Sequence, residues 1–274
     1  MSIRKIATRL KRKLLGKIPR NGSNPEKRVD LSVRDYLLES GQSDYPYFHY
    51  DNEEAARKAL SVVDQYTMCT YQRLITLYQQ VTYLDQAKIH GSLVECGTWR
   101  GGACGIMALA HMADGEPTRQ IHLFDSFEGL PEPDAKQDGF QSVGYAEERT
   151  YGNLNPIGRC IGPLEDNRYL MHELVKYPEE LTHYHVGWFQ QTLPVAVDNL
   201  GPIALLRLDG DWYESTKICL KLLYPLVSSG GIVVIDDYGR WEGCHKAVDE
   251  FMSTLEQPLL LNHIDGSGRY VIVP

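Results

Sequence analysis

Apolar and polar positions alternate along the chain with two different periods, and the pattern is regular from about residue 68 onward. Short apolar runs of strand length are followed by longer stretches in which apolar residues recur every three or four positions, as on one face of a helix. The pattern predicts helices at 68–87, 103–112, 215–226 and 244–255, and strands at 92–97, 120–127, 184–189, 203–208, 232–236, 259–263 and 269–273.

The order of these elements predicts the fold class. Strands that alternate with helices form parallel sheets with helices on both faces. The last two predicted strands lie too close together for a crossover helix between them. We therefore expect an α/β fold, a Rossmann-like, doubly wound and mostly parallel seven-stranded sheet with an antiparallel C-terminal strand.

The same pattern divides the chain into segments. Residues 1–20 form a basic N-terminal arm, 21–90 an N-terminal helical segment and 91–274 the main α/β domain. Within that domain, residues 128–183 separate two predicted strands by far more than the few residues of a compact connection. Glycine and proline are dense in the first half of this insertion, and 164–177 has a helical pattern. We expect a lid or binding loop rather than a surface elaboration without function.

Charge distinguishes the arm from the rest of the chain. The arm carries eight Lys or Arg and no acid, so the total of −8 leaves −16 for the remainder. Such an acidic body argues against nucleic acid as a partner. No apolar stretch reaches the roughly 18 residues of a membrane span. The arm favours a solvated segment over weak contact with an anionic membrane surface. The six cysteines lack paired spacing and indicate reduced thiols of a cytoplasmic protein.

Acidic residues directly follow two of the predicted strands. Asp209 and Asp211 come after the run 203–208, and Asp236 and Asp237 follow 232–235. Neighbouring parallel strands bring such residues to one edge of the sheet, where ligands bind. Helix capping is the alternative role, but converging carboxylates repel one another unless a cation joins them. Oxygen ligands suit Mg²⁺, with Mn²⁺ as a substitute, so the sequence predicts a divalent metal site.

A glycine-rich turn follows the first predicted strand. Residues 94–102 read VECGTWRGG, and glycines there let a ligand approach the backbone closely. Trp99 occupies the middle glycine position of a dinucleotide fingerprint, and Glu95 would repel a pyrophosphate. S-adenosylmethionine has no phosphate and carries a cationic sulfonium, so it suits this turn better. Asp125 ends the next strand, where it can accept hydrogen bonds from both ribose hydroxyls. Packing is the alternative role for Trp99.

Together these motifs resemble a known family, the class I methyltransferases related to macrocin O-methyltransferase. The family consists of metal-dependent enzymes that methylate deoxysugar hydroxyls of natural products. The motifs occur in the family's order and span roughly residues 65–255, a span that leaves out the basic arm. The resembling strings are Thr67-Met68, VECGTWRGG at 94–102, LFDSFEGLP at 123–131, GWFQQTLP at 187–194, LRLDGDWYEST at 206–216 and GGIVVIDDY at 230–238.

The resemblance implies roles for individual residues. It implies metal ligation by Asp209, Asp236 and Asp237, with Asp209 also as the general base. A sugar hydroxyl is a poor acid, and a bound Mg²⁺ would lower its pKa and orient it. Cofactor contacts are implied for Thr67, Met68, Glu95, Gly97, Thr98, Trp99, Arg100, Gly101, Asp125, Ser126 and Asp209.

Alternative functions stay open at this point. A catechol-type small-molecule acceptor would use the same chemistry but predicts a small, closed slot. The long insertion and the aromatic stretch 45–50 instead favour a bulkier, glycosylated small-molecule acceptor. A non-catalytic nucleotide-binding or interaction module is disfavoured by the full set of carboxylates. His49 and His245 are rival bases that we interpret as structural, and His183 and His185 receive no role. We further expect a homo-oligomer.

Overall fold

The structure is a computed structural model that describes residues 53–113, 115–147 and 151–274. The predictions about the basic arm, the aromatic stretch 45–50 and His49 lie outside the described residues. Among the described residues, no helix combines the length and the apolar character needed to cross a bilayer.

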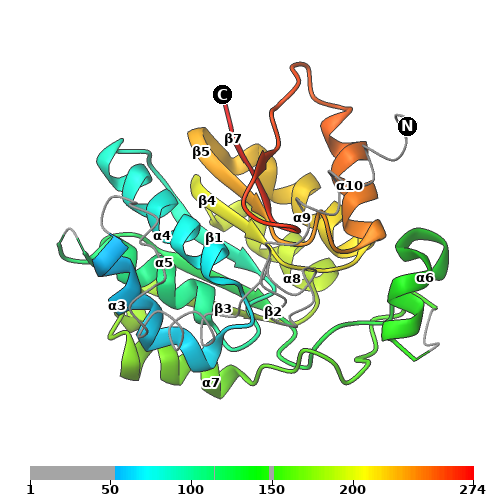
Figure 1. Ribbon diagram of the computed structural model, residues 1–274, viewed down its shortest axis with the longest axis horizontal. Coiled ribbons are helices and arrows are strands. Elements are labelled where there is room, and N and C mark those ends of the chain that lie inside the picture. Colours follow the sequence, from blue (N-terminus) through cyan, green and yellow to red (C-terminus); the bar gives the residue numbers. More distant parts are fainter. Residues whose placement is uncertain (1–52, 114, 148–150) are drawn as a thin grey trace, which may run out of the picture.

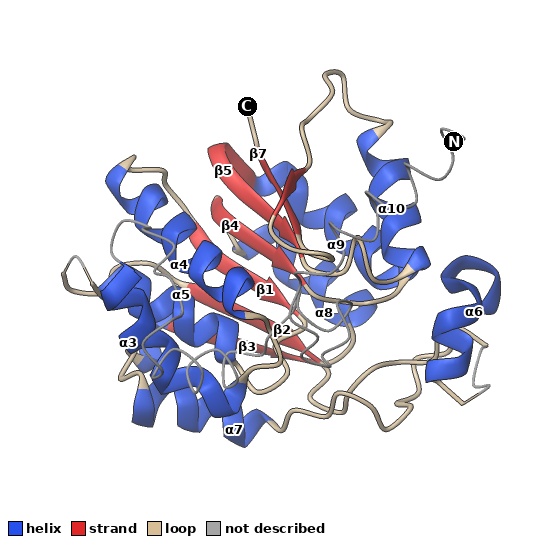
Figure 2. Ribbon diagram, in the orientation of Figure 1, coloured by secondary structure: helices blue, strands red, loops and turns tan. Residues whose placement is uncertain are grey.

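A seven-stranded sheet forms the centre of the described part (Figure 2). The first five strands in spatial order are parallel, and β7 runs antiparallel to both of its neighbours. The predicted doubly wound sheet with an antiparallel C-terminal strand is therefore confirmed. The order is β3 (Thr182–Val186), β2 (Ile121–Asp125), β1 (Ser92–Cys96), β4 (Ile203–Leu208), β5 (Val227–Ile235), β7 (Arg269–Ile272) and β6 (Asn262–His263).

Helices cover both faces of this sheet (Figure 1). Leu93 and Leu205 of the central strands join the core on the first face, and Val94 and Leu206 join the core on the second. Because parallel strands are buried on both faces, they consist of continuous apolar runs, which is why the sequence reveals them. The first face carries α3 (Glu53–Val63), α4 (Tyr71–Gln86) and α5 (Gly102–Met112), and the second carries α8 (Phe189–Ala196), α9 (Tyr213–Leu223) and α10 (Glu242–Met252).

The insertion contains more helix than the sequence predicts. Helix α6 (Ala135–Tyr145) was not predicted because its glycines suggest a loop, and Gly139 indeed interrupts it with φ 75° and ψ −177°. The helix predicted at 164–177 begins correctly as α7 (Leu164–Arg168), but it continues as a π-helical stretch that ends at Leu174.

One predicted strand is displaced. The strand predicted at 184–189 lies instead at Thr182–Val186, and Phe189 already begins α8. Gly187, with φ 137°, turns the chain out of the strand and toward the helix. The residues predicted as one strand therefore belong partly to β3 and partly to α8. A strand-like alternation of apolar and polar residues does not show where such a strand ends and a helix begins.

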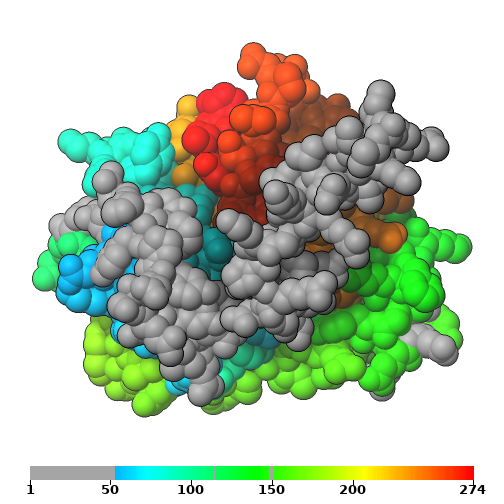
Figure 3. All heavy atoms as spheres, viewed as in Figure 1, coloured from blue at the N-terminus to red at the C-terminus, as the bar shows by residue number. Residues whose placement is uncertain are grey.

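The insertion packs against α9 and α10 through α6. In Figure 3 its green surface lies on the right of the molecule beside the orange and brown surface of the C-terminal half. The Asp138 carboxylate accepts hydrogen bonds from the backbone N–H of Tyr213 at 2.7 Å and of Asp134 at 2.8 Å. A Cβ atom at Gly243 would lie 1.9 Å from the same carboxylate, so only glycine permits this close approach. Asp138 is therefore the polar contact that joins α6 to the start of α9.

The buried carboxyl group of Asp138 should make the stability of the protein depend on pH. Burial raises the pKa of Asp138 from 3.8 to about 6, although its two backbone donors oppose the shift. A carboxyl whose pKa is higher in the folded state stabilises that state below about pH 4, and this contribution is lost as the pH rises through about 6. We expect the melting temperature of wild type, relative to that of Asp138→Asn, to fall between about pH 4 and pH 6 and to level off above that range. A difference that is independent of pH would contradict this account.

Candidate active site

A cavity of about 570 Å³ lies at the carboxyl ends of the central strands. Glycines permit its construction. Gly97 has φ 89°, and a Cβ atom there would lie 1.8 Å from the carbonyl oxygen of Asp209. A Cβ atom at Gly102 would lie 2.5 Å from the carbonyl oxygen of Tyr66, which precedes Thr67 in the cavity wall. Three segments that are distant in sequence therefore meet at backbone contact only because these positions lack a side chain.

Asp125 holds the glycine-rich turn in place. Its Oδ2 accepts hydrogen bonds from the backbone N–H groups of Thr98 at 2.7 Å and Trp99 at 3.1 Å. Its Oδ1 accepts from the N–H of Phe127 at 2.7 Å. Burial raises the pKa of Asp125, and these backbone donors oppose the shift. Asp125 thus organises the turn, and the remaining lone pairs of its carboxylate can still accept from a ligand hydroxyl.

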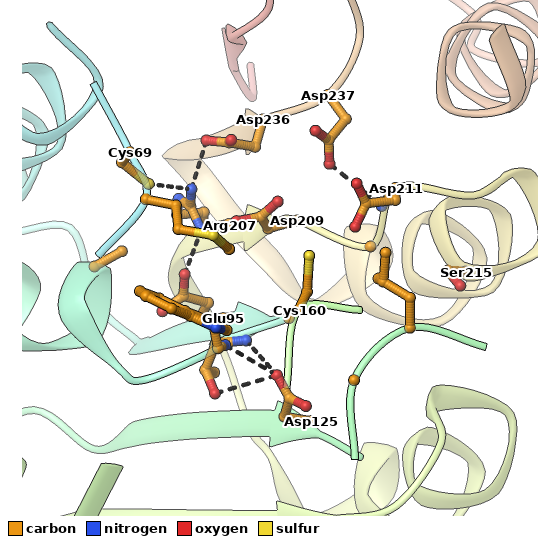
Figure 4. Close-up of a pocket in the computed structure, with 18 of the residues that line it drawn as sticks. Cys69, Glu95, Asp125, Cys160, Arg207, Asp209, Asp211, Ser215, Asp236 and Asp237 are labelled. Carbon is orange, nitrogen blue, oxygen red and sulfur yellow. Dashed lines mark hydrogen bonds and ion pairs between the residues drawn. The ribbon is translucent and has the colours of Figure 1, made fainter. Parts of the chain in front are cut away.

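Four carboxylates converge on the opposite wall, as Figure 4 shows. Single oxygens of Asp209, Asp211 and Asp237 all lie within 4.8 Å of one another, and a second group joins Asp209 and Asp236 to Cys69. Asp211 has φ 57°, a left-handed conformation that is uncommon for a residue other than glycine. The Nε1–H of Trp241 donates to its Oδ1 at 2.6 Å and fixes the carboxyl group.

Two arginines compensate part of this charge. Arg207 is 3% exposed and donates to Asp209 at 2.9 Å and to Asp236 at 2.5 Å. Arg73 also pairs with Asp236 and donates to Asp265 at 2.7 Å. The charge of Asp236 is therefore balanced, whereas neither arginine pairs with Asp211 or Asp237.

Asp211 and Asp237, which have no ion-pair partner among the described residues, fit a cation, although the charge of Arg240 opposes part of the pKa shift of Asp211. Burial raises the pKa of Asp237, and the charges of Asp211 and Asp209 raise it further. Burial, followed by the charge of Asp209, raises the pKa of Asp211 to about 8. Like charges at this distance favour protonation unless a positive charge joins them. Oxygen-only donors at this spacing suit Mg²⁺.

Most of the residues predicted to contact the cofactor or the metal are found in the lining of one cavity, but Arg100 and Gly101 are not. The guanidinium of Arg100 instead donates to Asp166 at 2.6 Å and to the carbonyl oxygen of Gln65 at 2.7 Å, so we withdraw its side chain from the cofactor site. The cavity-lining residues are Thr67, Met68, Glu95, Gly97, Thr98, Trp99, Asp125, Ser126, Asp209, Asp236 and Asp237.

Glu95 also differs from the expectation. Its side chain is fully buried, and both oxygens are engaged, one by Arg207 and the other by the thiol of Cys104 at 2.7 Å. The rival base His245 is half exposed on α10 and pairs with Asp249 at 3.1 Å. It is absent from the cavity lining.

Sequence reasoning missed three contributors to the site. Arg207 and Trp241 gave no signal in the sequence, because a charged residue inside an apolar strand and a tryptophan at a helix start have many ordinary uses. Cys160 reaches the cavity from the insertion, so no local motif could place it there. Asp211 was visible in the D-G-D motif but received no role of its own.

The fold and the cofactor turn are those of class I S-adenosylmethionine-dependent O-methyltransferases. The family described as Macrocin-O-methyltransferase (TylF) matches residues 9–272, so the chain belongs to this family and is an O-methyltransferase. The match extends beyond the span 65–255 of the sequence motifs. It includes residues 9–20 of the basic arm, which the motif pattern had left outside the resemblance.

Individual relatives support this assignment. Demethyldecarbamoylnovobiocin O-methyltransferase of Streptomyces niveus is 36% identical over 206 residues, which cover 75% of this chain and 74% of that protein. The 8-demethyl-8-(2,3-dimethoxy-alpha-L-rhamnosyl)-tetracenomycin-C 4'-O-methyltransferase of Streptomyces olivaceus is 35% identical over 227 residues, covering 81% and 83%. The solved structure of the O-methyltransferase NovP is 33% identical with a TM-score of 0.64, covering 76% and 82%.

The turn generates a prediction about cofactor affinity. Asp125→Ala removes the acceptor of three backbone N–H groups and should weaken binding of S-adenosylhomocysteine about ten- to hundred-fold, since bonds to a charged group contribute about 1.5–3 kcal/mol. Calorimetric titration measures this change. Glu173→Gln, which removes an exposed carboxylate paired with Lys176, is the control and should leave the affinity unchanged. Equal affinities of the Asp125 variant and wild type would remove this residue from the cofactor site.

Proposed function

We propose that this enzyme transfers the methyl group of S-adenosylmethionine to a sugar hydroxyl of a natural product. The observation that carries the proposal is the shared cavity, in which the cofactor turn faces the carboxylate cluster. The name of the relative from Streptomyces olivaceus describes methylation at the 4' position of a rhamnosyl group, which is the kind of acceptor that we propose.

We further propose Mg²⁺ as the resident cation, with Mn²⁺ as a substitute, held by Asp209, Asp236 and Asp237. Although the oxygens of Asp236 accept from two arginines, each carboxylate oxygen has two lone pairs and can serve a second partner. The bound ion supplies acidification and orientation of the acceptor hydroxyl. Asp209 is the ligand common to two groups of converging side chains, one that contains Asp236 and one that contains Asp237, which supports its place at the centre of the proposed site.

We assign acceptance of the hydroxyl proton to Asp211 in place of Asp209. Asp209 already accepts from Arg207 and is committed to the cation. Asp211 is oriented through one oxygen by Trp241, and among the described residues no donor pairs with its second oxygen. That oxygen is available to an acceptor hydroxyl in the cavity.

An aromatic group borders the carboxylates on the acceptor side. Trp212 and Trp241 have ring centroids 5.0 Å apart, and Tyr145 of the insertion lies 5.4 Å from Trp241. Trp212 is 2% exposed and packs in the core behind Trp241, whereas Tyr145 and Trp241 line the cavity, and the Nε1–H of Trp241 donates to Asp211. This arrangement suits a sugar ring, which has an apolar face and hydroxyls at its edge.

Variants of the carboxylates separate the two proposed roles. Asp211→Asn should lower kcat by at least about a hundred-fold, because it removes the proton acceptor, and excess Mg²⁺ should not restore activity. Asp237→Asn should instead weaken Mg²⁺ binding and recover partly at high Mg²⁺. Initial rates across a Mg²⁺ series, with S-adenosylhomocysteine affinity as the control, distinguish the two. Full activity of Asp211→Asn, or of wild type in a strong chelator, would contradict these assignments.

The acceptor class has its own test. We expect glycosylated natural products with adjacent free sugar hydroxyls to be methylated with kcat/KM at least about ten-fold above that for catechols, because the aromatic surface binds the sugar ring; ten-fold corresponds to about 1.4 kcal/mol. Mass spectrometry of the products, with the sugar fragment analysed separately, locates the methyl group. Preferential methylation of catechol would favour the alternative acceptor.

The remaining expectations stay predictions from the sequence. They are the division at residues 20 and 90, a lid role for the insertion, homo-oligomeric assembly, a cytoplasmic location and a solvated basic arm.

A further inference from the structure

The guanidinium of Arg207 joins segments that belong to different parts of the site. It extends from β4 and is 3% exposed. One nitrogen donates to Glu95 and also to Asp209 at 2.9 Å, and the other donates to Asp236 at 2.5 Å and to the sulfur of Cys69 at 3.1 Å. Figure 4 shows the side chain between Asp236 on one side and Glu95 on the other.

Glu95 connects the two elements on either side of the cofactor turn. It is the penultimate residue of β1, two positions before Gly97, and its second oxygen accepts from the thiol of Cys104 in the first turn of α5. The carboxylate thus connects the two elements that flank the turn. Both carboxylate oxygens of Glu95 have protein partners, Arg207 and Cys104. A change in the interaction between Arg207 and Glu95 would therefore also affect the position of the turn.

The charge of Arg207 is divided among three carboxylates. Glu95, Asp209 and Asp236 all compete for the one guanidinium, whereas Arg73 supports only Asp236 and Asp265. A divalent cation at Asp209 and Asp236 would neutralise two of the three competitors. The attraction of the guanidinium for Glu95 would then strengthen relative to the others, and the turn would be held more firmly.

We propose that Arg207 is a positioning residue that links cation binding at the carboxylates to cofactor binding at the turn. This inference rests on the proposed metal site. Linkage between two ligands is reciprocal, so the cation should tighten cofactor binding by the factor by which the cofactor tightens cation binding. The consequence is that the presence of either ligand favours binding of the other.

Calorimetry measures this linkage without turnover. S-adenosylhomocysteine, whose sulfur is uncharged and does not repel the ion, is titrated into the full chain in chelator and again in saturating Mg²⁺. For wild type we expect the dissociation constant to fall about five-fold or more with Mg²⁺, a typical factor for coupled sites. In Glu95→Gln, which preserves shape but removes the charge, the ratio of the two constants should approach one. Arg207→Lys should act likewise, because a single ammonium cannot reach all three carboxylates.

The matched control is Arg73→Lys. This variant changes the arginine partner of Asp236 but has no contact with Glu95, so it should keep the five-fold ratio at saturating Mg²⁺. Melting temperatures verify that each variant is folded, and Glu95→Gln decides the outcome if Arg207→Lys does not fold. A wild-type ratio near one, or an unchanged ratio in Glu95→Gln, overturns the linkage while leaving the metal site intact. No heat of Mg²⁺ binding to wild type, together with full activity in chelator, overturns both proposals.

Discussion

Crowding of negative charge at the ends of parallel strands is the constraint on which the site depends. Strands β1, β4 and β5 deliver Glu95, Asp209 and Asp236 to one edge because their register leaves no alternative. Buried carboxylates at such distances are costly, and the guanidinium of Arg207 offsets part of that cost from within the sheet. Among the described residues, Glu95, Asp209 and Asp236 are thus paired with arginine, whereas Asp211 and Asp237 have no ion pair.

The remainder of the molecule holds this arrangement in position. Two apolar cores clamp the sheet, so the strand ends cannot move apart to relieve repulsion. The backbone contact at Gly97 fixes the distance between the cofactor turn and Asp209. The insertion is held by the hydrogen bond between Asp138 and Tyr213, and it adds Tyr145 and Cys160 to the cavity wall. Rigid strands therefore hold the carboxylates in place, and the insertion supplies a further part of the wall.

The sequence predicted those features that follow from local pattern. The central parallel strands are mostly apolar, so the number of strands and their order of appearance were evident, as were Asp209, Asp236 and Asp237 after β4 and β5. Features that depend on tertiary contacts were not predictable. The helix α6 is stabilised by its packing against α9 and α10 despite an internal glycine, and the pairing of Arg207 with Glu95 joins residues 112 positions apart. The side chain of Arg100 was assigned to the cofactor from its neighbours in the motif, but its direction is set by Asp166, which lies in the insertion.

The central claim is that converging strand-end carboxylates hold a divalent cation beside the cofactor. Anomalous diffraction from crystals grown with Mn²⁺ and S-adenosylhomocysteine tests it most directly. The account predicts one anomalous peak at about 2.2 Å from oxygens of Asp209, Asp236 and Asp237, with the cofactor in the same cavity. A cavity that contains the cofactor but no anomalous peak at these carboxylates, or a peak elsewhere in the molecule, would contradict the account.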